Sequence, residues 1–319
     1  MKDFRVGYLY SLAPIHCGGE GDLANISEIA REVHTNFPYI PGSSLRGSLR
    51  NELEEYQGKE IGDRLFGHEL TDGKMGVHQV WFGDARLLWV PMRTMSVKGE
   101  DVFTWVSCPT LLRDCALISR RSFDGFATLT SAVGSRKDTY MVADARVEVE
   151  AMTEEQTRSI ELTENWSSNL GDDTKSHWEN NRIVLPDNDF QVLMEHSLWT
   201  QVRNVITDAG AAEMFWTDVC IPRDTIFYYA WGYSVAKNDP IQIKDCEVMQ
   251  EILTGLIQVG GQANVGRGWV QSWVADGKSP LLDTESSSAV ETAAGDTKSA
   301  CLDAPSWSEN PTETHRYAD

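Results

Sequence analysis

The sequence lacks several features that would assign it to a familiar class. No apolar run approaches the ~20 residues of a membrane-spanning helix, and the first residues, MKDFRVGYLY, lack the pattern of a secretory signal peptide. None of the six cysteines forms a C-x-x-C pair, so neither a zinc site nor a dense disulfide framework is indicated. We therefore expect a soluble, cytoplasmic protein with reduced and mostly buried thiols.

Positive charge is also scarce. The chain of 319 residues has 28 Lys and Arg residues against 48 Asp and Glu residues, which gives a net charge of −20. This excess disfavours non-specific nucleic-acid binding, so any RNA site must be a local basic track. From Asp276 onward nine acidic residues face three basic ones, and little apolar content remains. That composition predicts an acidic, disordered tail over 276–319.

Hydrophobic periodicity predicts one domain over 1–275. Alternation from Phe4 to Leu12 predicts the first strand. Further strands are expected at 79–92, 102–108, 182–185, 213–221, 225–235 and 269–274, and helices at 43–58, 109–121, 187–206 and 245–258. The segment around 119–181 is less regular, and we interpret it as an insertion that projects from the core. This order favours an α+β fold with ferredoxin-like βαββαβ units.

The stretch FPYIPGSSLRGSLR, from Phe37 to Arg50, predicts an extended segment that turns directly into a helix. Its two prolines favour extended backbone, and Ser43 or Ser44 can cap the helix that follows. Arg46 and Arg50 lie four residues apart. Free amides at a helix N-terminus beside two guanidiniums can bind phosphate. On these residues alone, a capped surface helix with solvated arginines is the simpler interpretation.

The stretch GGQANVGRGWV, from Gly260 to Val270, is a glycine-rich loop. It runs from helix to strand and has no Gly-Lys-Ser/Thr, which excludes a nucleotide P-loop and a dinucleotide-binding fold. A tight connection is the alternative interpretation. However, four glycines in nine residues exceed what a turn needs, so close approach to a ligand is favoured.

The long loop over 14–36 holds the candidates for acid–base chemistry. His16 lies beside Cys17, but a metal site or a nucleophile pair needs a third partner, so we interpret these as unrelated polar residues; His16 could instead contact a phosphate or a base. Any of four carboxylates could act as a general acid or base, although solvated side chains are the simpler interpretation. They are Glu20, Asp22, Glu28 and Glu32.

Three blocks together resemble one known family. FPYIPGSSLRGSLR, after a glycine-bearing first loop, resembles the hallmark of the RAMP superfamily of CRISPR proteins. FGDARLLWVPMRTMSVKGEDVFTWVSCPTLL resembles a block typical of the backbone subunit of type III-B (Cmr-type) effector complexes, and GGQANVGRGWV resembles the C-terminal glycine-rich loop of that family. RIVLPDNDF and IPRDTIFYYAWGY add weaker matches in the same order, so the resemblance spans roughly residues 1–274.

The resemblance implies an RRM-like palm with an inserted thumb, in a subunit that stacks head to tail along the CRISPR RNA. Each thumb interrupts the guide–target duplex at a regular interval, and base pairing reads the sequence. The implied partners are CRISPR RNA, complementary target RNA, copies of this chain and other effector subunits, without a membrane. The implied RNA-binding residues are His16, Ser43, Ser44, Arg46, Arg50, Gly260, Gly261, Asn264, Gly266, Arg267 and Gly268.

The family also cuts target RNA with an aspartate that precedes an Ile-x-Arg-Glu run, which is 29–32 here. The aspartate position falls on Ile26, or on Ser27 if a one-residue gap is placed there, and neither side chain can replace a carboxylate. We therefore expect a subunit that binds guide and target but cuts poorly or not at all, with no cofactor. The alternative is an active endoribonuclease that uses Asp22 or Glu28, with Mg²⁺. A guide-processing nuclease with histidine chemistry around His16 is more remote.

Overall fold

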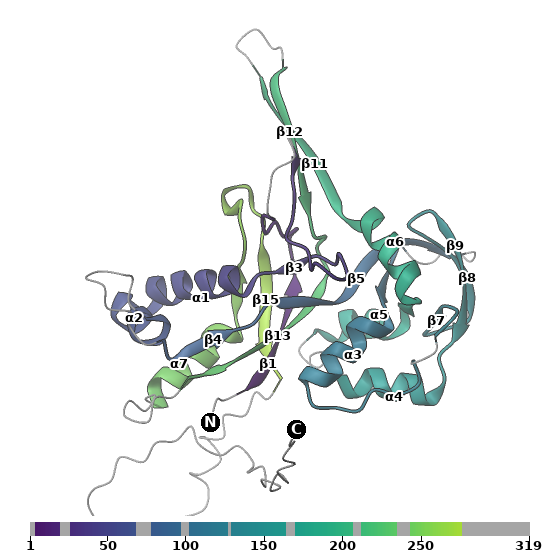
Figure 1. The fold of residues 1–319 in the computed structure, drawn as a ribbon, viewed down its shortest axis with the longest axis horizontal. Helices are drawn as coiled ribbons and strands as arrows, with labels where there is room; N and C mark the ends of the chain where they lie inside the picture. Colours follow the sequence, from purple (N-terminus) through teal and green to yellow (C-terminus); the bar gives the residue numbers. More distant parts are fainter. Residues whose placement is uncertain are drawn as a thin grey trace, which may run out of the picture.

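The computed structural model of this chain describes residues 4–19, 26–67, 78–96, 102–126, 129–163, 170–206, 212–234 and 243–275. They form a mixed α+β fold, as expected, around a 12-stranded sheet and a smaller 3-stranded sheet (Figure 1). The large sheet has the order β14-β15-β1-β13-β5-β6-β10-β7-β9-β8, with β3 and β4 attached to β5 and β13. The expected tail over 276–319 lies outside the described residues.

The first half of this sheet, which we call the palm, places the first strand, β1, beside the last strand of the described residues, β15. β1 pairs antiparallel with both β13 and β15, and β13 pairs antiparallel with β5. Figure 1 shows α1, α2 and α7 grouped on one side of these strands. The palm elements are β1 (Arg5–Ser11), β3 (Tyr39–Ile40), α1 (Gly42–Gln57), α2 (Lys59–Phe66), β4 (Val80–Phe82), β5 (Ala85–Ser96), β13 (Ile226–Tyr233), α7 (Ile243–Leu253), β14 (Leu256–Gln258) and β15 (Trp269–Val274).

Helix α1 forms because apolar residues recur every fourth position. Leu45, Leu49 and Leu53 are fully buried on its inner face. The expectation that Ser43 or Ser44 caps this helix is wrong, because Pro41 is the N-cap residue and no side chain of the cap bonds there. Instead, the amide of Gly42 donates a hydrogen bond of 2.8 Å to the carboxylate of Asp84.

The same corner corrects the expected strand over 79–92, which is divided into β4 and β5. The break falls at Gly83 and Asp84. The Gly83 amide donates to the carbonyl of Ala230 at 2.7 Å, while Asp84 turns to the start of α1. The strand breaks here because the Gly83 backbone bonds β13, whereas the Asp84 side chain bonds the start of α1.

The second half of the sheet contains most of the segment around 119–181. This segment has more regular structure than the sequence indicated, because the β8–β9 hairpin extends β5 and β7 pairs with β10. The elements here are β6 (Phe103–Ser107), α3 (Pro109–Ile118), β7 (Val133–Gly134), β8 (Asp138–Val142), β9 (Ala145–Ala151), α4 (Glu154–Thr163), α5 (Asp172–Asn180), β10 (Arg182–Val184) and α6 (Asp187–Ser197).

A long hairpin of β11 (Trp199–Ile206) and β12 (Ala212–Cys220) projects from the body (Figure 1). The short strand β2 (Ile26–Ser27) pairs parallel with β12 and completes the small sheet. The expected helix over 187–206 is therefore wrong beyond Ser197, because WTQVRNVI pairs residue by residue with β12. The expected helix over 245–258 likewise ends at Leu253, and β14 follows after Gly255.

Two features of the described residues bear on the cellular expectations. No helix among them is long and apolar enough to cross a membrane. The cysteines within the described ranges are free and buried, as expected: Cys17, Cys108, Cys115, Cys220 and Cys246.

Candidate nucleic-acid interface

The base of the projecting hairpin meets the first loop and the glycine-rich loop. The Gly261 amide donates to the carbonyl of His16 at 2.8 Å, which joins two loops that are far apart in the sequence. In the small sheet, Ser27 lies opposite Asp218 of β12. The elements β2, β12 and the glycine-rich loop thus converge on one region.

Asp218 holds this region together. Its side chain is 1% exposed and forms ion pairs with Arg203 at 2.5 Å and Arg267 at 3.2 Å, while Gln262 donates to its other oxygen at 3.1 Å. Burial alone raises the pKa of Asp218, but the contacts from Arg203 and Gln262 and the two positive charges outweigh it and lower that pKa. The carboxylate is therefore ionised at neutral pH, and the cluster has a net charge of +1 within an acidic chain.

Arg267, expected as an RNA ligand, is placed inside this cluster. Its side chain is 6% exposed. Besides Asp218, it donates to the amide oxygens of Gln201, at 2.6 Å, and of Gln262. The hydrogen bonds that Arg267 donates join the glycine-rich loop to the hairpin, so its role in this structure is to stabilise the region as a buried residue.

Arg203 is the accessible cation of the cluster, and the sequence reasoning missed it. Its side chain is 29% exposed, and its guanidinium lies over the ring of Trp216 at 5.2 Å. The apolar residues of WTQVRNVI keep helical spacing, so that stretch fell within the expected helix and no local alternation marked it as a strand.

Two of the four glycines in the loop are required by its shape. Gly268 has φ 84°, and a Cβ there would lie 2.1 Å from the carbonyl oxygen of Val259. Gly260 has φ 80°, and a Cβ there would lie 2.5 Å from the carbonyl oxygen of His16. Any larger residue would push the loop away from the strands beneath it.

The remaining expected loop residues form an exposed tip. Gly261, Asn264 and Gly266 are all exposed, and the short 3-10 turn η2 (Ala263–Val265) lies between the glycines. A Cβ built on Gly266 has no atom within 4 Å. The tip therefore offers backbone and one amide side chain to a ligand from outside.

His16 is buried beneath the loop with both ring nitrogens engaged. Its Nδ1 lies 2.8 Å from the carbonyl oxygen of Val219, and its Nε2 lies 3.2 Å from the Ser27 hydroxyl. A carbonyl only accepts, so Nδ1 carries a proton, and in the neutral ring Nε2 is then the acceptor for the Ser27 hydroxyl. With its side chain fixed in this way, His16 braces the first loop, and these contacts do not favour its use as an acid or base.

The start of α1, beside the β4–β5 corner, is the second part of the expected interface. Ser43 is exposed and Ser44 is half-buried, so both backbone and hydroxyl groups reach the surface. However, the Asp84 carboxylate already bonds the first amide of this helix, which partly neutralises the positive end of its dipole.

The two arginines of α1 have different environments. Arg46 is half-buried, donates to the carbonyl of Phe66 and lies over that ring at 5.5 Å. Burial and the neighbouring charge of Arg50 lower the pKa of Arg46. Arg50 pairs with Glu54 at 2.6 Å and Asp63 at 2.7 Å, with a side chain only 15% exposed, so it links α1 to α2.

At the expected catalytic position, the side chains are apolar or hydroxyl. Ile26 is 39% exposed, and Ser27 bonds His16. Glu28 lies 3.9 Å from Arg31, which also makes a two-pronged pair with Glu195. Asp22 lies outside the described residues, and among those described no three His, Cys, Asp or Glu side chains could jointly hold a metal ion.

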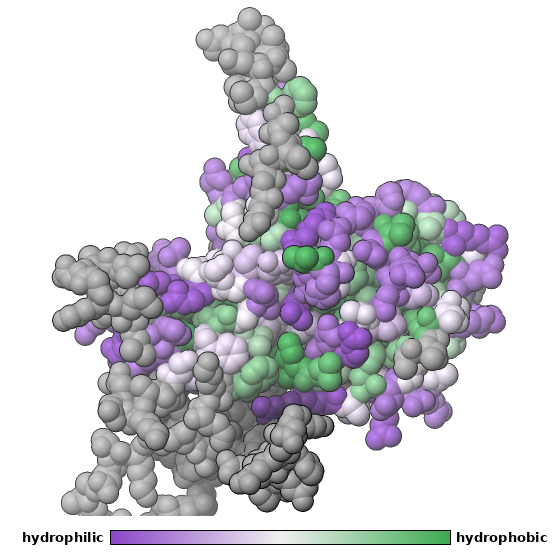
Figure 2. Space-filling view, in the orientation of Figure 1, coloured by the Kyte–Doolittle hydropathy of each residue, from purple (hydrophilic) through white to green (hydrophobic). Residues whose placement is uncertain are grey.

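Apolar side chains are exposed on the outer face of the hairpin, where Figure 2 shows hydrophobic residues. Val202 and Phe215 are 64% and 59% exposed. Ile26 is in the same row as Val202, because both pair with Thr217. The expected catalytic position is thus part of an apolar face.

Comparison with known proteins assigns the family. The family model of the RAMP superfamily matches residues 8–271. The chain belongs to the RAMP superfamily. It is 30% identical over 287 residues to a relative from Pyrococcus furiosus, the CRISPR system Cmr endoribonuclease Cmr4, covering 85% of this chain and 95% of that relative.

Solved structures share the fold. A chain of the type III-B Cmr-beta complex bound to cognate target RNA superposes with a TM-score of 0.66 at 18% identity, covering 86% of this chain and 97% of that one. Oligomeric Cmr4 from Pyrococcus furiosus gives a TM-score of 0.62 at 23% identity, covering 86% of this chain and 98% of that one. The resemblance of the sequence motifs to RAMP subunits of Cmr type is confirmed.

Proposed function

We propose that this chain is a CRISPR RNA-binding backbone subunit of a type III-B effector complex that holds guide RNA paired with target RNA. The observation that carries the proposal is the Asp218 cluster, which joins the projecting hairpin to the glycine-rich loop and has a net positive charge in an acidic chain. The relative named Cmr4 and the neighbour bound to cognate target RNA support the same assignment.

The proposal includes a ferredoxin-like palm with the hairpin as its thumb. The order β15-β1-β13-β5, with every neighbouring pair antiparallel, supports this plan. In the chain, α1 follows β1 and α7 follows β13, which are the two crossover helices of a βαββαβ unit.

The expected RNA-binding residues divide into two groups in this proposal. The tip residues Gly261, Asn264 and Gly266 contact the guide backbone, together with Ser43, Ser44, Arg46 and Arg203. The second group fixes the shape of the interface from inside, because its members are buried or already paired: His16, Arg50, Gly260, Arg267 and Gly268.

The proposed partners follow from this role. Copies of this chain stack along the guide, other effector subunits flank them, and target RNA pairs with the guide in the cytoplasm. The exposed apolar face of Ile26, Val202 and Phe215 is suited to a contact that excludes water, such as a neighbouring subunit or an unstacked base step.

We further propose that the subunit does not cut target RNA. An aspartate at this position would bind Mg²⁺ or accept a proton, and neither Ile26 nor Ser27 has a carboxylate. The alternative, an active endoribonuclease that uses Asp22 or Glu28 with Mg²⁺, is less favoured for Glu28 because Arg31 lies beside its carboxylate.

The test is a cleavage assay with the assembled complex, labelled complementary RNA and Mg²⁺. We expect no regularly spaced products from the natural sequence. Ile26→Asp and Ser27→Asp test whether a restored carboxylate produces such cuts, with Ile26→Asn as the uncharged control. Regularly spaced products that disappear in Glu28→Ala or Asp22→Ala would establish the alternative instead. Guide-dependent binding of target RNA, measured in parallel, tests the binding role independently of cutting.

A further inference from the structure

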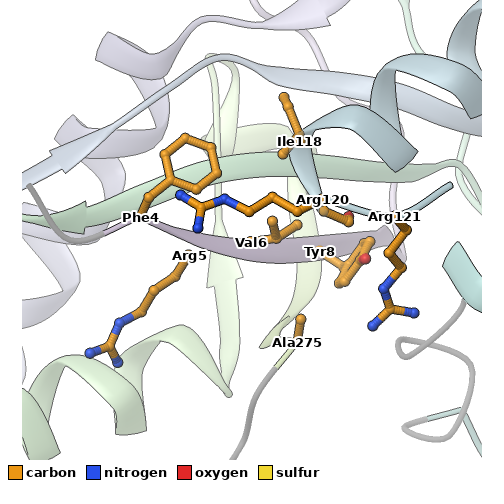
Figure 3. Close-up of a pocket in the computed structure, with 9 residues that line it drawn as sticks. Phe4, Arg5, Val6, Tyr8, Ile118, Arg120, Arg121 and Ala275 are labelled. Carbon is orange, nitrogen blue, oxygen red and sulfur yellow. The ribbon is translucent and has the colours of Figure 1, made fainter. Parts of the chain in front are cut away.

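A pocket lies at the end of the palm where the described chain finishes. It has a volume of about 220 Å³ and is lined by the start of β1, the C-terminal end of α3 and Ala275 (Figure 3). We call it the arginine pocket, after Arg5, Arg120 and Arg121, which line it together with Tyr8 and Ser119. Figure 3 shows the Arg120 side chain extending toward Phe4, whereas Arg5 and Arg121 extend in opposite directions on either side of Ala275.

Two of these arginines have no carboxylate within ion-pair distance among the described residues. Arg120 is exposed, and its guanidinium lies 5.8 Å from the centre of the Phe4 ring. Arg121 is half-buried. In contrast, Arg50 and Arg64 each contact a carboxylate of another helix. Arg120 and Arg121 are thus cations without a carboxylate partner among the described residues, which is unusual in a chain with a net charge of −20. Their guanidiniums can bind an anion at this pocket.

The sequence supplies a matching anion at this place. The Ala275 amide donates to the carbonyl of Val6 at 3.0 Å, so the chain leaves the palm at the pocket. The next residue is Asp276, and 276–319 contains nine acidic residues against three basic ones. Because this segment is covalently joined at the pocket, its local concentration is on the order of millimolar, which favours it over any free anion.

RNA fits the position less well. The pocket adjoins the C-terminal end of β15, whereas the glycine-rich loop precedes the first residue of that strand. A strand of six residues spans about 20 Å, so the two features lie at opposite ends of the palm. Phosphates bound at the glycine-rich loop would not reach the arginine pocket directly.

We propose that the arginine pocket binds carboxylate side chains of the acidic segment 276–319 of the same chain. The acidic segment then neutralises the positive charge of the arginine pocket, which is far from the hairpin. The base of the hairpin remains as the positively charged site for RNA. This inference does not rest on the proposed RNA-binding function.

Cross-linking of the full chain tests the inference. Arg120→Lys and Arg121→Lys keep the positive charge and add a primary amine, which a carbodiimide joins to a nearby carboxylate. We expect peptide mapping to find these amines joined to residues 276–285 in monomeric protein, at about five times the yield of the control Arg113→Lys. Arg113 is on α3, which ends two residues before Arg120, and its side chain is 55% exposed beside Asp114. In 1 M salt, where the Debye length is about 3 Å, the excess over the control should disappear.

Three results would overturn the inference. The first is a yield no higher than that of Arg113→Lys, with thermal unfolding unchanged. The second is coupling found only in cross-linked dimers, which would assign the acidic segment to another copy. The third comes from the double substitution Arg120→Gln and Arg121→Gln. We expect it to leave guide affinity within about twofold, whereas a tenfold loss would mean that the pocket binds RNA.

Discussion

Asp218→Asn removes the negative charge that Arg203 and Arg267 share at the base of the hairpin. Asn keeps one acceptor oxygen, so the shape of the side chain is nearly unchanged while the charge is lost. Arg267, at 6% exposure, is then left buried without a carboxylate and with only uncharged amide oxygens, such as those of Gln201 and Gln262, as partners. Breaking a buried pair on one side costs about 3–5 kcal/mol.

The lower end of that range applies here, because the Arg203 side chain is 29% exposed and is partly screened by water. We therefore expect the substitution to reduce the free energy of unfolding by about 3 kcal/mol, or the melting temperature by roughly 6–12 °C. Guide RNA affinity should fall as well, because the hairpin and the glycine-rich loop lose their common anchor.

Asp245→Asn is the matched control. Asp245 is also 1% exposed and pairs with one arginine, Arg64, but it joins α7 to α2 away from the hairpin. It should lower stability comparably and leave guide affinity unchanged at a temperature where both variants are folded. The reasoning is refuted if Asp218→Asn unfolds within 1 kcal/mol of the natural sequence, or if both variants lose RNA affinity equally.

The lowered pKa of Asp218 adds a dependence on pH. Its contribution to stability is complete above the ordinary unfolded value of about 3.9 and is lost as pH falls through the lower folded value. The stability difference between the natural chain and Asp218→Asn should therefore shrink in denaturant titrations below about pH 4. A difference that stayed constant through this range would contradict the assignment of the charge.

Three further predictions concern single residues. Arg46→Ala should weaken guide binding with little change in stability. Arg50→Ala should instead lower the free energy of unfolding by about 1–2 kcal/mol, because its ion pairs are lost, and leave guide binding nearly unchanged. Filter binding and thermal unfolding distinguish the two variants. Gly268→Ala should destabilise the chain by more than about 2 kcal/mol, whereas Gly266→Ala, at φ 78° with open space around it, should cost about 1 kcal/mol in chemical denaturation. Burial and the neighbouring Cys220 raise the pKa of Cys17 to about 12, so iodoacetamide at pH 8 should label Cys17 only after unfolding.

Local sequence patterns predicted the helices and strands whose own apolar spacing matches the face that they bury. The alternation in β1 and the leucine spacing of α1 predicted both correctly, because each buries one face against the palm. The start of β11 could not be found in this way. Its apolar residues continue the helical spacing of α6, and the strand exists because β12 pairs with it.

The candidate interface shows the same division. The density of glycines identified the loop, and the positive φ angles of Gly260 and Gly268 explain why glycine is needed there. The burial of Arg267 was not predictable, because its partners Asp218 and Gln201 lie 49 and 66 residues away in the chain. An arginine in a glycine-rich loop suggests a phosphate ligand until its internal partners are known.

These internal pairs also determine how guide binding should respond to salt. Arg50 and Arg267 are paired with carboxylates, and their side chains are only 15% and 6% exposed. Arg203 is also paired, with Asp218, but its side chain is 29% exposed, and Arg46 is half-buried, so these two are the more accessible cations of the proposed interface among the described residues. Two phosphate contacts to a single strand correspond to a slope of about −1.4 in a plot of log K against log salt. Guide affinity should therefore depend steeply on salt only when several subunits bind the same guide. Filter binding with guides that hold one, two or three subunits measures this directly. A slope of −4 or steeper for a single subunit would mean that additional basic residues bind the guide, and the assignment of the interface would then be wrong.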